Sequence, residues 1–180
     1  MSTPVRTEPQ KLVLAATYRH KEFFIKAMEL TERKYGEIDY VGGEFDFTFT
    51  EYYSDEMGEG LKKRMISLKN LIEPDKLVSV KKFSFEAEKN FIDEHSRRRI
   101  NIDPGLLSRN NLVLSTFKNS PHRIYLGEGV YAEIELIYRN GGFAPLQWTY
   151  PDYAAHHLMD TFSIIRLIYL NQLKKLDGVK

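Results

Sequence analysis

A hairpin near the C-terminal end of the chain gathers residue types that could bind or react with a small ligand. This segment, residues 120–139, reads SPHRIYLGEGVYAEIELIYR. Side chains alternate between the two faces of a strand, so Tyr131, Glu133 and Glu135 share the face opposite the apolar one. Carboxylates on such a surface could bind a cationic group or exchange protons with a ligand. We expect Glu133 to be the acid–base residue and Glu135 to face solvent.

The first strand of the same hairpin adds a cation and a second aromatic ring. The short glycine-containing turn places Arg123 and Tyr125 near the face that carries Tyr131 and Glu133. A guanidinium there could bind a carboxylate or a phosphate of a ligand, and the tyrosines could wall the same surface. The alternative is cross-strand pairing of Arg and Glu on a solvated sheet face, which stabilises a sheet by about 0.2–1 kcal/mol per pair. The sequence leaves both interpretations open.

Two further residues could complete an acid–base set with Glu133. Asp103 lies in RRINIDPG, which predicts a strand that ends in a Pro-Gly turn and feeds a helix, and such strand ends are usual ligand sites. His122 ends the following connection and adjoins Arg123. We expect Asp103, His122 and Glu133 to be the catalytic residues if the protein is an enzyme. Their spacing matches no metal signature such as H-E-x-x-H, so we predict no metal ligands, and the sequence identifies no cofactor.

A basic segment suggests a different class of function. Arg97, Arg98 and Arg99 are consecutive, and aromatic residues nearby could stack on bases as they do in single-strand binders. Alternate residues of a strand face opposite sides, however, so the three arginines do not form one patch. We also count Arg99 among the ligand-binding candidates. The favoured function is binding of a small polar or phosphorylated metabolite at the polar face of the 122–139 hairpin, with turnover left open. The alternative is a non-catalytic RNA- or protein-binding module.

The composition excludes several classes of protein. The chain has no cysteine, which excludes thiolate catalysis, iron–sulfur clusters and disulfides. Its 26 basic and 25 acidic residues give a net charge of +1, which provides no overall field to attract nucleic acid. No apolar run approaches the roughly 18 residues of a transmembrane helix, and the N-terminal residues are too polar for a signal peptide. We therefore expect a cytoplasmic protein without a membrane partner, and the sequence does not indicate its oligomeric state.

The elements that must position these residues follow from hydrophobic periodicity. The expected order is a strand at 11–17, a helix at 20–35, a hairpin at 38–53, a strand at 62–71, a helix at 74–91, a strand at 98–103, a helix at 108–118 capped by Ser108, the hairpin at 120–139, an extended arm at 141–148 and a helix at 152–176. Hairpins mixed with helices favour an α+β fold, with helices packed on one face of a mainly antiparallel sheet. The similar element order of the two halves raises the alternative of a ferredoxin-like duplication. We expect a flexible tail at residues 1–10 and a single domain at residues 11–180.

Four stretches of the sequence resemble a prokaryotic family of uncharacterised function, known as domain of unknown function 4416. They are FDFTFTEYYSDEMG, RRRINIDPG, HRIYLGEGVYAEIELIYRNGGF and WTYPDY, and they occur in the family's order. The resemblance extends from about Lys11 to Leu173. It implies no established activity and no catalytic residues, although members are sometimes labelled GTP-binding.

GTP binding of the P-loop kind is excluded by the sequence. A P-loop needs G-x-x-x-x-G-K-[ST], because its backbone amides surround the phosphates and its lysine and hydroxyl contact them and Mg²⁺. The chain contains no such string. Its glycine-rich segments at 58–60 and 127–129 both read GEG, and the carboxylate of each would repel a phosphate.

GTP with Mg²⁺ should therefore leave the melting temperature of the protein unchanged. A ligand at 100 times its dissociation constant stabilises a protein by about 2.7 kcal/mol, which a thermal-shift measurement detects readily. ATP with Mg²⁺ is the control. A clear increase in melting temperature with GTP but not with ATP would contradict the exclusion.

Overall fold

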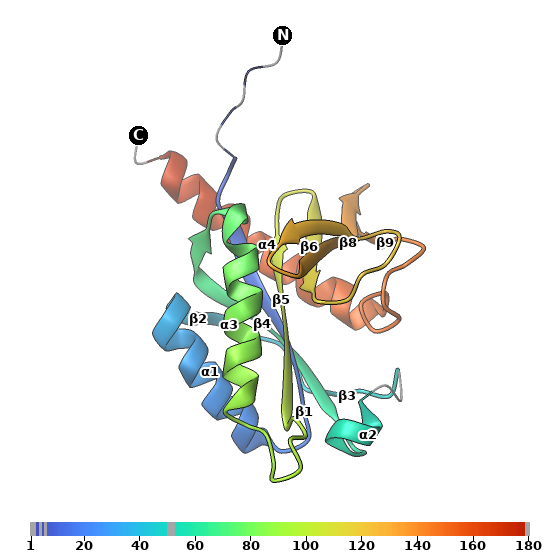
Figure 1. Ribbon diagram of the computed structural model, residues 1–180. Coiled ribbons are helices and arrows are strands. Elements are labelled where there is room, and N and C mark those ends of the chain that lie inside the picture. The colour runs from blue at the N-terminus through green and yellow to red at the C-terminus, as the bar shows by residue number, and fades with distance from the viewer. Residues whose placement is uncertain (1–2, 4, 6, 50–52, 179–180) are drawn as a thin grey trace.

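A computed structural model describes residues 3, 5, 7–49 and 53–178 of the chain. In this part of the chain one sheet has the strand order β2-β4-β1-β5-β6-β8-β7, with β3 paired to β4 and β9 paired to β8 (Figure 1). The elements are β1 (Gln10–Tyr18), α1 (Lys21–Tyr35), β2 (Ile38–Val41), β3 (Phe45–Asp46), α2 (Ser54–Met57), β4 (Lys62–Ile72), the 3₁₀ turn η1 (Pro74–Lys76), α3 (Leu77–Lys89), β5 (Ile100–Leu107), β6 (Asn111–Thr116), β7 (Ile124–Gly127), β8 (Val130–Arg139), β9 (Gly142–Pro145) and α4 (His156–Asp177). These strand pairs are antiparallel, and the predicted α+β class is confirmed.

The first half of the chain forms a split β-α-β unit. Helix α1 connects β1 to β2, helix α3 connects β4 to β5, and the four strands lie in the order β2-β4-β1-β5. This order is that of the ferredoxin-like arrangement. Alternate residues of β1, such as Leu12 and Leu14, face the buried sides of α1 and α3. Both helices cover the same face of the sheet (Figure 1).

The second half extends the sheet and covers its opposite face. Strands β6, β8 and β7 continue from β5, and α4 packs against the other side of β1. Phe162, Ile165 and Tyr169 of α4 are buried in this second cluster together with Val13 and Ala15 of β1. The predicted packing on one face therefore describes α1 and α3, while α4 lies on the reverse side of the sheet (Figure 1).

The segment predicted as a helix at 108–118 is strand β6 instead. Its burial alternates, with Leu112 and Leu114 in the core, and this is the period of a strand. Ser108 caps a hairpin turn, because its hydroxyl accepts hydrogen bonds from the backbone N–H groups of Asn110 at 3.1 Å and Asn111 at 3.0 Å. The second half consequently does not repeat the strand–helix–strand order of the first. The ferredoxin-like arrangement is confined to the first half.

The hairpin predicted at 38–53 is also absent from the described residues of that range. Strands β2 and β3 do not pair with each other, because both pair with β4, at Ile66–Leu68 and at Lys62–Lys63 respectively. The Gly-Gly segment between them lets the chain continue along one edge instead of reversing. Residues 50–52 lie outside the described residues.

The N-terminal residues contact the rest of the protein earlier than expected. Residues 1–2, 4 and 6 lie outside the described residues, but Gln10 already belongs to β1. The guanidinium of Arg109 binds the carboxylate of Glu8 through bonds of 2.7 to 3.0 Å, and the Tyr169 hydroxyl donates to the Pro9 carbonyl at 2.9 Å. Among the described helices, none combines the length and the apolar character needed to cross a membrane.

Strands β5 and β6 meet at a narrow crossing and then separate. Strand β6 pairs with β5 only from Gly105 to Leu107, whereas β1 pairs with the whole length of β5. The predicted Pro-Gly turn is therefore wrong, because Asp103, Pro104 and Gly105 lie within β5. Proline is tolerated there because β5 has no partner on that side before Gly105. The split between the two strands opens a space at the centre of the sheet.

Gly105 is required at this crossing because the backbones approach closely. A Cβ atom added to Gly105 would lie 2.5 Å from the carbonyl oxygen of Val113 and 2.7 Å from a methyl group of Leu114. The contact with the Val113 carbonyl cannot be relieved by moving a flexible side-chain end, because it is a contact with backbone.

The Gly105→Ala substitution should therefore destabilise the protein by about 1–3 kcal/mol, as overpacked cores do. Chemical denaturation measures the change. Gly43→Ala is the matched control, since a Cβ atom there has no neighbour within 4 Å, and it should leave stability nearly unchanged. Equal free energies of unfolding for the two variants would show that the crossing is not constrained in this way.

Candidate functional site

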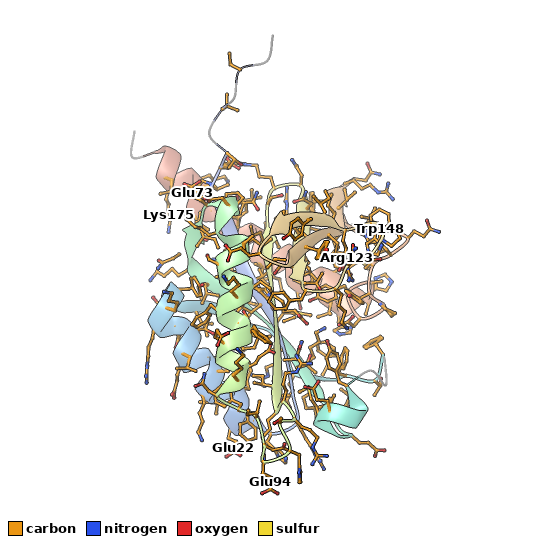
Figure 2. The ribbon with its side chains drawn as sticks, viewed as in Figure 1. Glu22, Glu73, Glu94, Arg123, Trp148 and Lys175 are labelled. Carbon is orange, nitrogen blue, oxygen red and sulfur yellow. The ribbon has the colours of Figure 1, made fainter. Side chains whose placement is uncertain are left out.

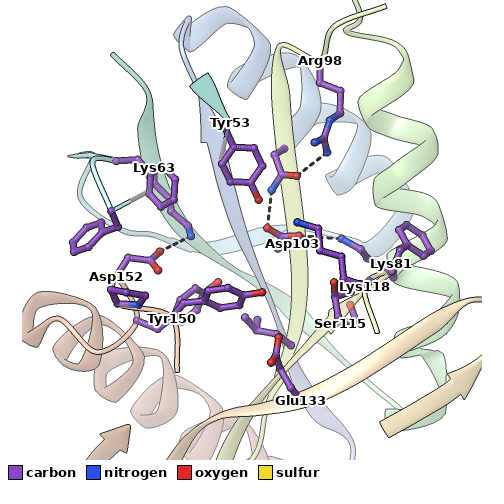
Figure 3. Close-up of a pocket in the computed structure, with 18 residues that line it drawn as sticks. Tyr53, Lys63, Lys81, Arg98, Asp103, Ser115, Lys118, Glu133, Tyr150 and Asp152 are labelled. Atoms are coloured by element: carbon purple, nitrogen blue, oxygen red, sulfur yellow. Dashed lines mark hydrogen bonds and ion pairs between the residues drawn. The ribbon is translucent and has the colours of Figure 1, made fainter. Parts of the chain in front are cut away.

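A cavity of about 480 Å³ lies in the split between β5 and β6. Its volume falls within the range of roughly 300–1,000 Å³ that is usual for small-molecule sites. Its walls come from β4, α3, β5, β6 and β8 and from residues 146–155, which we call the strap (Figure 3). Charged and aromatic side chains from these separate elements point into one space (Figure 3).

The first buried ion pair of the cavity joins β4 to the strap. Lys63 Nζ lies 2.5 Å from Asp152 Oδ2, and both side chains are almost fully buried. The same ammonium group lies 4.8 Å from the ring centres of Phe47 and Tyr153, a distance at which a cation is attracted to a ring face. A buried lysine is costly without such partners. Asp152 supplies the carboxylate that compensates the charge of Lys63.

The second ion pair joins α3 to β5. Lys81 Nζ lies 3.0 Å from Asp103 Oδ1, and the amide of Asn101 donates to Asp103 Oδ2 at 2.6 Å. Burial alone would raise the pKa of Asp103, but the charges of Lys81 and Lys63 and these hydrogen bonds outweigh it and lower the pKa. Asp103 is therefore a carboxylate at neutral pH, and it remains partly open toward the cavity.

Arg98 holds the base of this wall in place. Its guanidinium binds both carboxylate oxygens of Glu56 at 2.6 and 2.7 Å, Glu88 at 3.1 Å and the Asn101 carbonyl oxygen at 2.8 Å. Glu88 also accepts the backbone N–H of Ile102 at 2.6 Å. Burial raises the pKa of Glu88 to about 7. The network connects α2, α3 and β5, so it fixes the positions of Asn101 and Asp103.

Glu133 of β8 borders the cavity from the side of the hairpin. Its carboxylate lies 2.7 Å from His122 Nε2 and 3.0 Å from an Arg123 nitrogen, and only 1% of the side chain is exposed. Arg123 also donates to the hydroxyl of Tyr150 at 2.7 Å. The His122 ring stacks on Trp148, with ring centres 5.2 Å apart, and Arg123 and Trp148 lie near each other beside β8 (Figure 2).

Glu135 holds the strap against β8. Its carboxylate accepts the backbone N–H of Tyr150 at 2.6 Å, and its backbone carbonyl accepts the Thr149 hydroxyl at 2.5 Å. The expectation that Glu135 faces solvent is wrong, since the residue is fully buried. The strap is the reason, because Thr149 and Tyr150 cover this residue. Leu112 pairs with Leu136 and Val113 with Ile134, so Glu135 is also the extra residue of a bulge.

The residues predicted from the sequence fall into three groups. Asp103 and Glu133 both line the cavity, as expected of site residues. His122 and Arg123 contact Glu133 but do not line the cavity. Of the predicted set, His122 and Glu133 contact each other, whereas Asp103 lies elsewhere on the cavity wall and is bound by Lys81 and Asn101.

The remaining candidates lie away from the cavity. Tyr125 and Tyr131 contact each other, with ring centres 5.1 Å apart, and Tyr125 is more than half exposed. Arg99 lies over the ring of Phe23, 5.4 Å from its centre, and does not line the cavity. Within the described part of the chain, no three His, Asp or Glu side chains are grouped so that they could hold a metal ion.

Sequence reasoning missed the two lysines and Asp152. On α3, Ser84 follows Lys81 by three residues, and Glu88 follows Ser84 by four. All three are buried on the face that packs against the sheet. Polar residues that recur within an apolar stripe at helical spacing are a signal of buried polar contacts, and this signal was available in the sequence.

Comparisons with known proteins identify a family but no better characterised relative. The model of a family described as a domain of unknown function, DUF4416, matches residues 8–169. Neither the comparison with curated proteins nor that with solved structures finds a match.

Glu135 should make the stability of the protein depend on pH. Burial, with smaller contributions from the charges of Glu133 and Asp152, raises the pKa of Glu135 to about 8, against 4.5 for an ordinary glutamate. Between these values the folded protein holds a proton that the unfolded chain releases, so stability falls as the pH rises from about 4.5 to about 8. Glu135→Gln cannot ionise and keeps an oxygen for the Tyr150 N–H.

The Gln variant should thus melt at a higher temperature than wild type above pH 8, and the difference should disappear near pH 5. The gain at high pH should be on the order of a few kcal/mol, because one pKa unit corresponds to about 1.4 kcal/mol. Glu128→Gln, which alters an exposed glutamate of the same hairpin, controls for the loss of one carboxylate. A difference that is equal at both pH values would contradict the assignment.

Proposed function

The chain belongs to the DUF4416 family, a membership that brings no activity with it, and we propose that the cavity between β5 and β6 binds a small polar or phosphorylated metabolite. The observation that carries this proposal is that two Lys–Asp ion pairs, one buried and one partly buried, come from four different segments and face the same cavity. Glu133 borders the same space from a fifth segment. Small-molecule sites commonly combine a concave shape, aromatic walls and a few fixed polar groups.

A purely structural role accounts less well for these ion pairs. Replacing a buried ion pair by apolar residues of similar volume is often neutral or stabilising, so such pairs are weak contributors to stability. Protein interiors are also closely packed, whereas these pairs border a cavity of about 480 Å³. Charged groups that line a cavity are better explained by a ligand that uses them.

The proposed site lies at the inner side of the hairpin and not across its exposed face. The 122–139 hairpin reaches the cavity through Glu133, while His122 and Arg123 hold this carboxylate from outside. If the protein turns its ligand over, Glu133 and Asp103 are the carboxylates placed to exchange a proton with it. We also propose a cytoplasmic location, in keeping with the absence of cysteine.

The alternative of an RNA- or protein-binding module at Arg97–Arg99 gains no specific support. Arg97 binds Asp93, and Arg98 is occupied by Glu56 and Glu88. Arg99 lies over an aromatic ring of a different segment. The three guanidinium groups thus have separate partners and form no common surface for a phosphate backbone.

Binding can be tested by thermal shift with monosaccharides, cyclic polyols, amino acids, nucleosides and the phosphorylated form of each, all at millimolar concentration. At least one compound should raise the melting temperature of the wild-type protein. The pocket variant Lys81→Met with Asp103→Asn should lose this shift, because it removes one ion pair without changing the net charge or the volume greatly.

The matched control is Lys89→Met with Glu86→Gln, which removes an exposed ion pair from the same helix. This variant should respond to the compound as wild type does. The proposal fails if no compound stabilises the wild-type protein, or if the pocket variant and the control respond equally.

A further inference from the structure

We propose that the ligand of this cavity is an uncharged, hydroxyl-rich ring, that is, a sugar or a cyclic polyol, and that phosphorylated compounds bind less well. This inference rests on the proposed function and names the ligand class for the same site. The ligand class follows from the pairing of lysines with aspartates in the cavity and from the aromatic side chains that line it.

Four cations line the described part of the cavity, and three of them, Lys63, Lys81 and Arg98, are compensated by carboxylates. Lys63 faces Asp152 and Lys81 faces Asp103, at 2.5 and 3.0 Å respectively. Arg98 directs its donors to two glutamates and to Asn101. A phosphate that approached either lysine would also approach the aspartate bound to it, and would be repelled.

A hydroxyl group matches such an ion pair better than a charged group does. Each hydroxyl has one donor and two acceptor positions, so it can accept a bond from a lysine and donate one to the aspartate of the same pair. A phosphate oxygen only accepts and an ammonium group only donates, so either one suits half of the pair and opposes the other half. Asn101, whose amide already donates to Asp103 at 2.6 Å, offers the same mixture of donor and acceptor.

Two such pairs on separate walls match a ring that carries several hydroxyl groups. Lys63 and Asp152 belong to β4 and the strap, whereas Lys81 and Asp103 belong to α3 and β5. Figure 3 shows the two pairs on different sides of the cavity. Hydroxyl groups on opposite edges of one ring could reach both pairs at the same time.

Aromatic rings supply the apolar contact that the faces of such a ring need. Six of the 18 lining residues are aromatic, which is one third, whereas aromatic residues make up 13% of the chain. They are Phe47, Phe49, Tyr53, Phe117, Tyr150 and Tyr153. Lys63 lies between two of these rings, 4.8 Å from each ring centre, so apolar and hydrogen-bonding groups alternate along that wall. The faces and the edge of a sugar ring present the same alternation.

The effect of Asp103→Asn on binding distinguishes the two ligand classes by its sign. Isothermal titration should compare myo-inositol and methyl glucoside with glucose 6-phosphate and inorganic phosphate. For an uncharged polyol, the variant should weaken binding about tenfold, because a charged acceptor becomes a neutral one. For a phosphorylated ligand, the variant should tighten binding, because it removes a repelling charge. Glu86→Gln, which changes an exposed carboxylate of α3, should alter neither affinity.

A second variant tests the aromatic wall and leaves every charged residue of the cavity in place. Phe117 is 41% exposed and lines the cavity, so Phe117→Leu should fold and should weaken polyol binding several-fold.

The ligand class is overturned if glucose 6-phosphate binds at least tenfold more tightly than methyl glucoside and Asp103→Asn tightens the binding of glucose 6-phosphate further. That outcome leaves the proposed function standing. If none of the four compounds binds to the wild-type protein, the ligand class is also overturned, and the broader compound set then decides the proposed function separately.

Discussion

The contact between the backbones of β5 and β6 at Gly105 is the constraint on which the candidate site depends. The strands can approach so closely only because this position has no side chain. Before it, β5 has a free edge, and the Ser115 hydroxyl bridges the widening gap by donating to the Pro104 carbonyl at 2.8 Å. The sheet thus keeps its continuity through a short ladder while it opens a cavity at its centre. The chemistry of the cavity is secondary to this backbone geometry.

A sheet that opens in this way needs a cover, and the strap supplies it at the cost of burying acids. Its attachments are the Lys63–Asp152 pair to β4, the Glu135 contacts to β8 and the hydrogen bond from Trp148 Nε1 to the Ile134 carbonyl at 2.8 Å. Glu135 has one buried oxygen without a hydrogen bond partner, which is unfavourable in itself. The same residue binds the strap through Tyr150 and Thr149, so the destabilising group also helps to hold the cover of the cavity in place.

The sequence predicts the periodic parts of this fold and misses the parts where periodicity breaks. Apolar spacing predicts strand β1, helices α1 and α3 and the β7–β8 hairpin. Gly36 predicts the end of α1, where its backbone N–H donates to the Glu32 carbonyl. Strand β6 was missed because a short run such as Leu-Val-Leu fits a helix or a strand, and long-range pairing decides between them. The burial of Glu135 depends on the strap, a distant segment, so the alternation of residues along β8 does not predict it. Asp103 and Glu133 were identified as site residues by type, but their partners come from distant segments that local patterns do not connect.

The partners of Asp103 and of the other charged residues that line the cavity also belong to the framework of the fold. Helix α3 carries Val80 and Ala87 into the core while Lys81 and Glu88, one residue further on, contact β5 and the Arg98 network. A change of one charged residue in the cavity wall therefore leaves its partner uncompensated and lowers stability, so the affinity of a single variant such as Asp103→Asn is interpreted only once its folding has been verified. Pairwise substitutions that preserve neutrality separate the two effects, because they remove the polar contact without leaving a buried charge. The ion pairs thus belong to the scaffold and to the site at once, and their effect on ligand binding can be measured only against a scaffold that still folds.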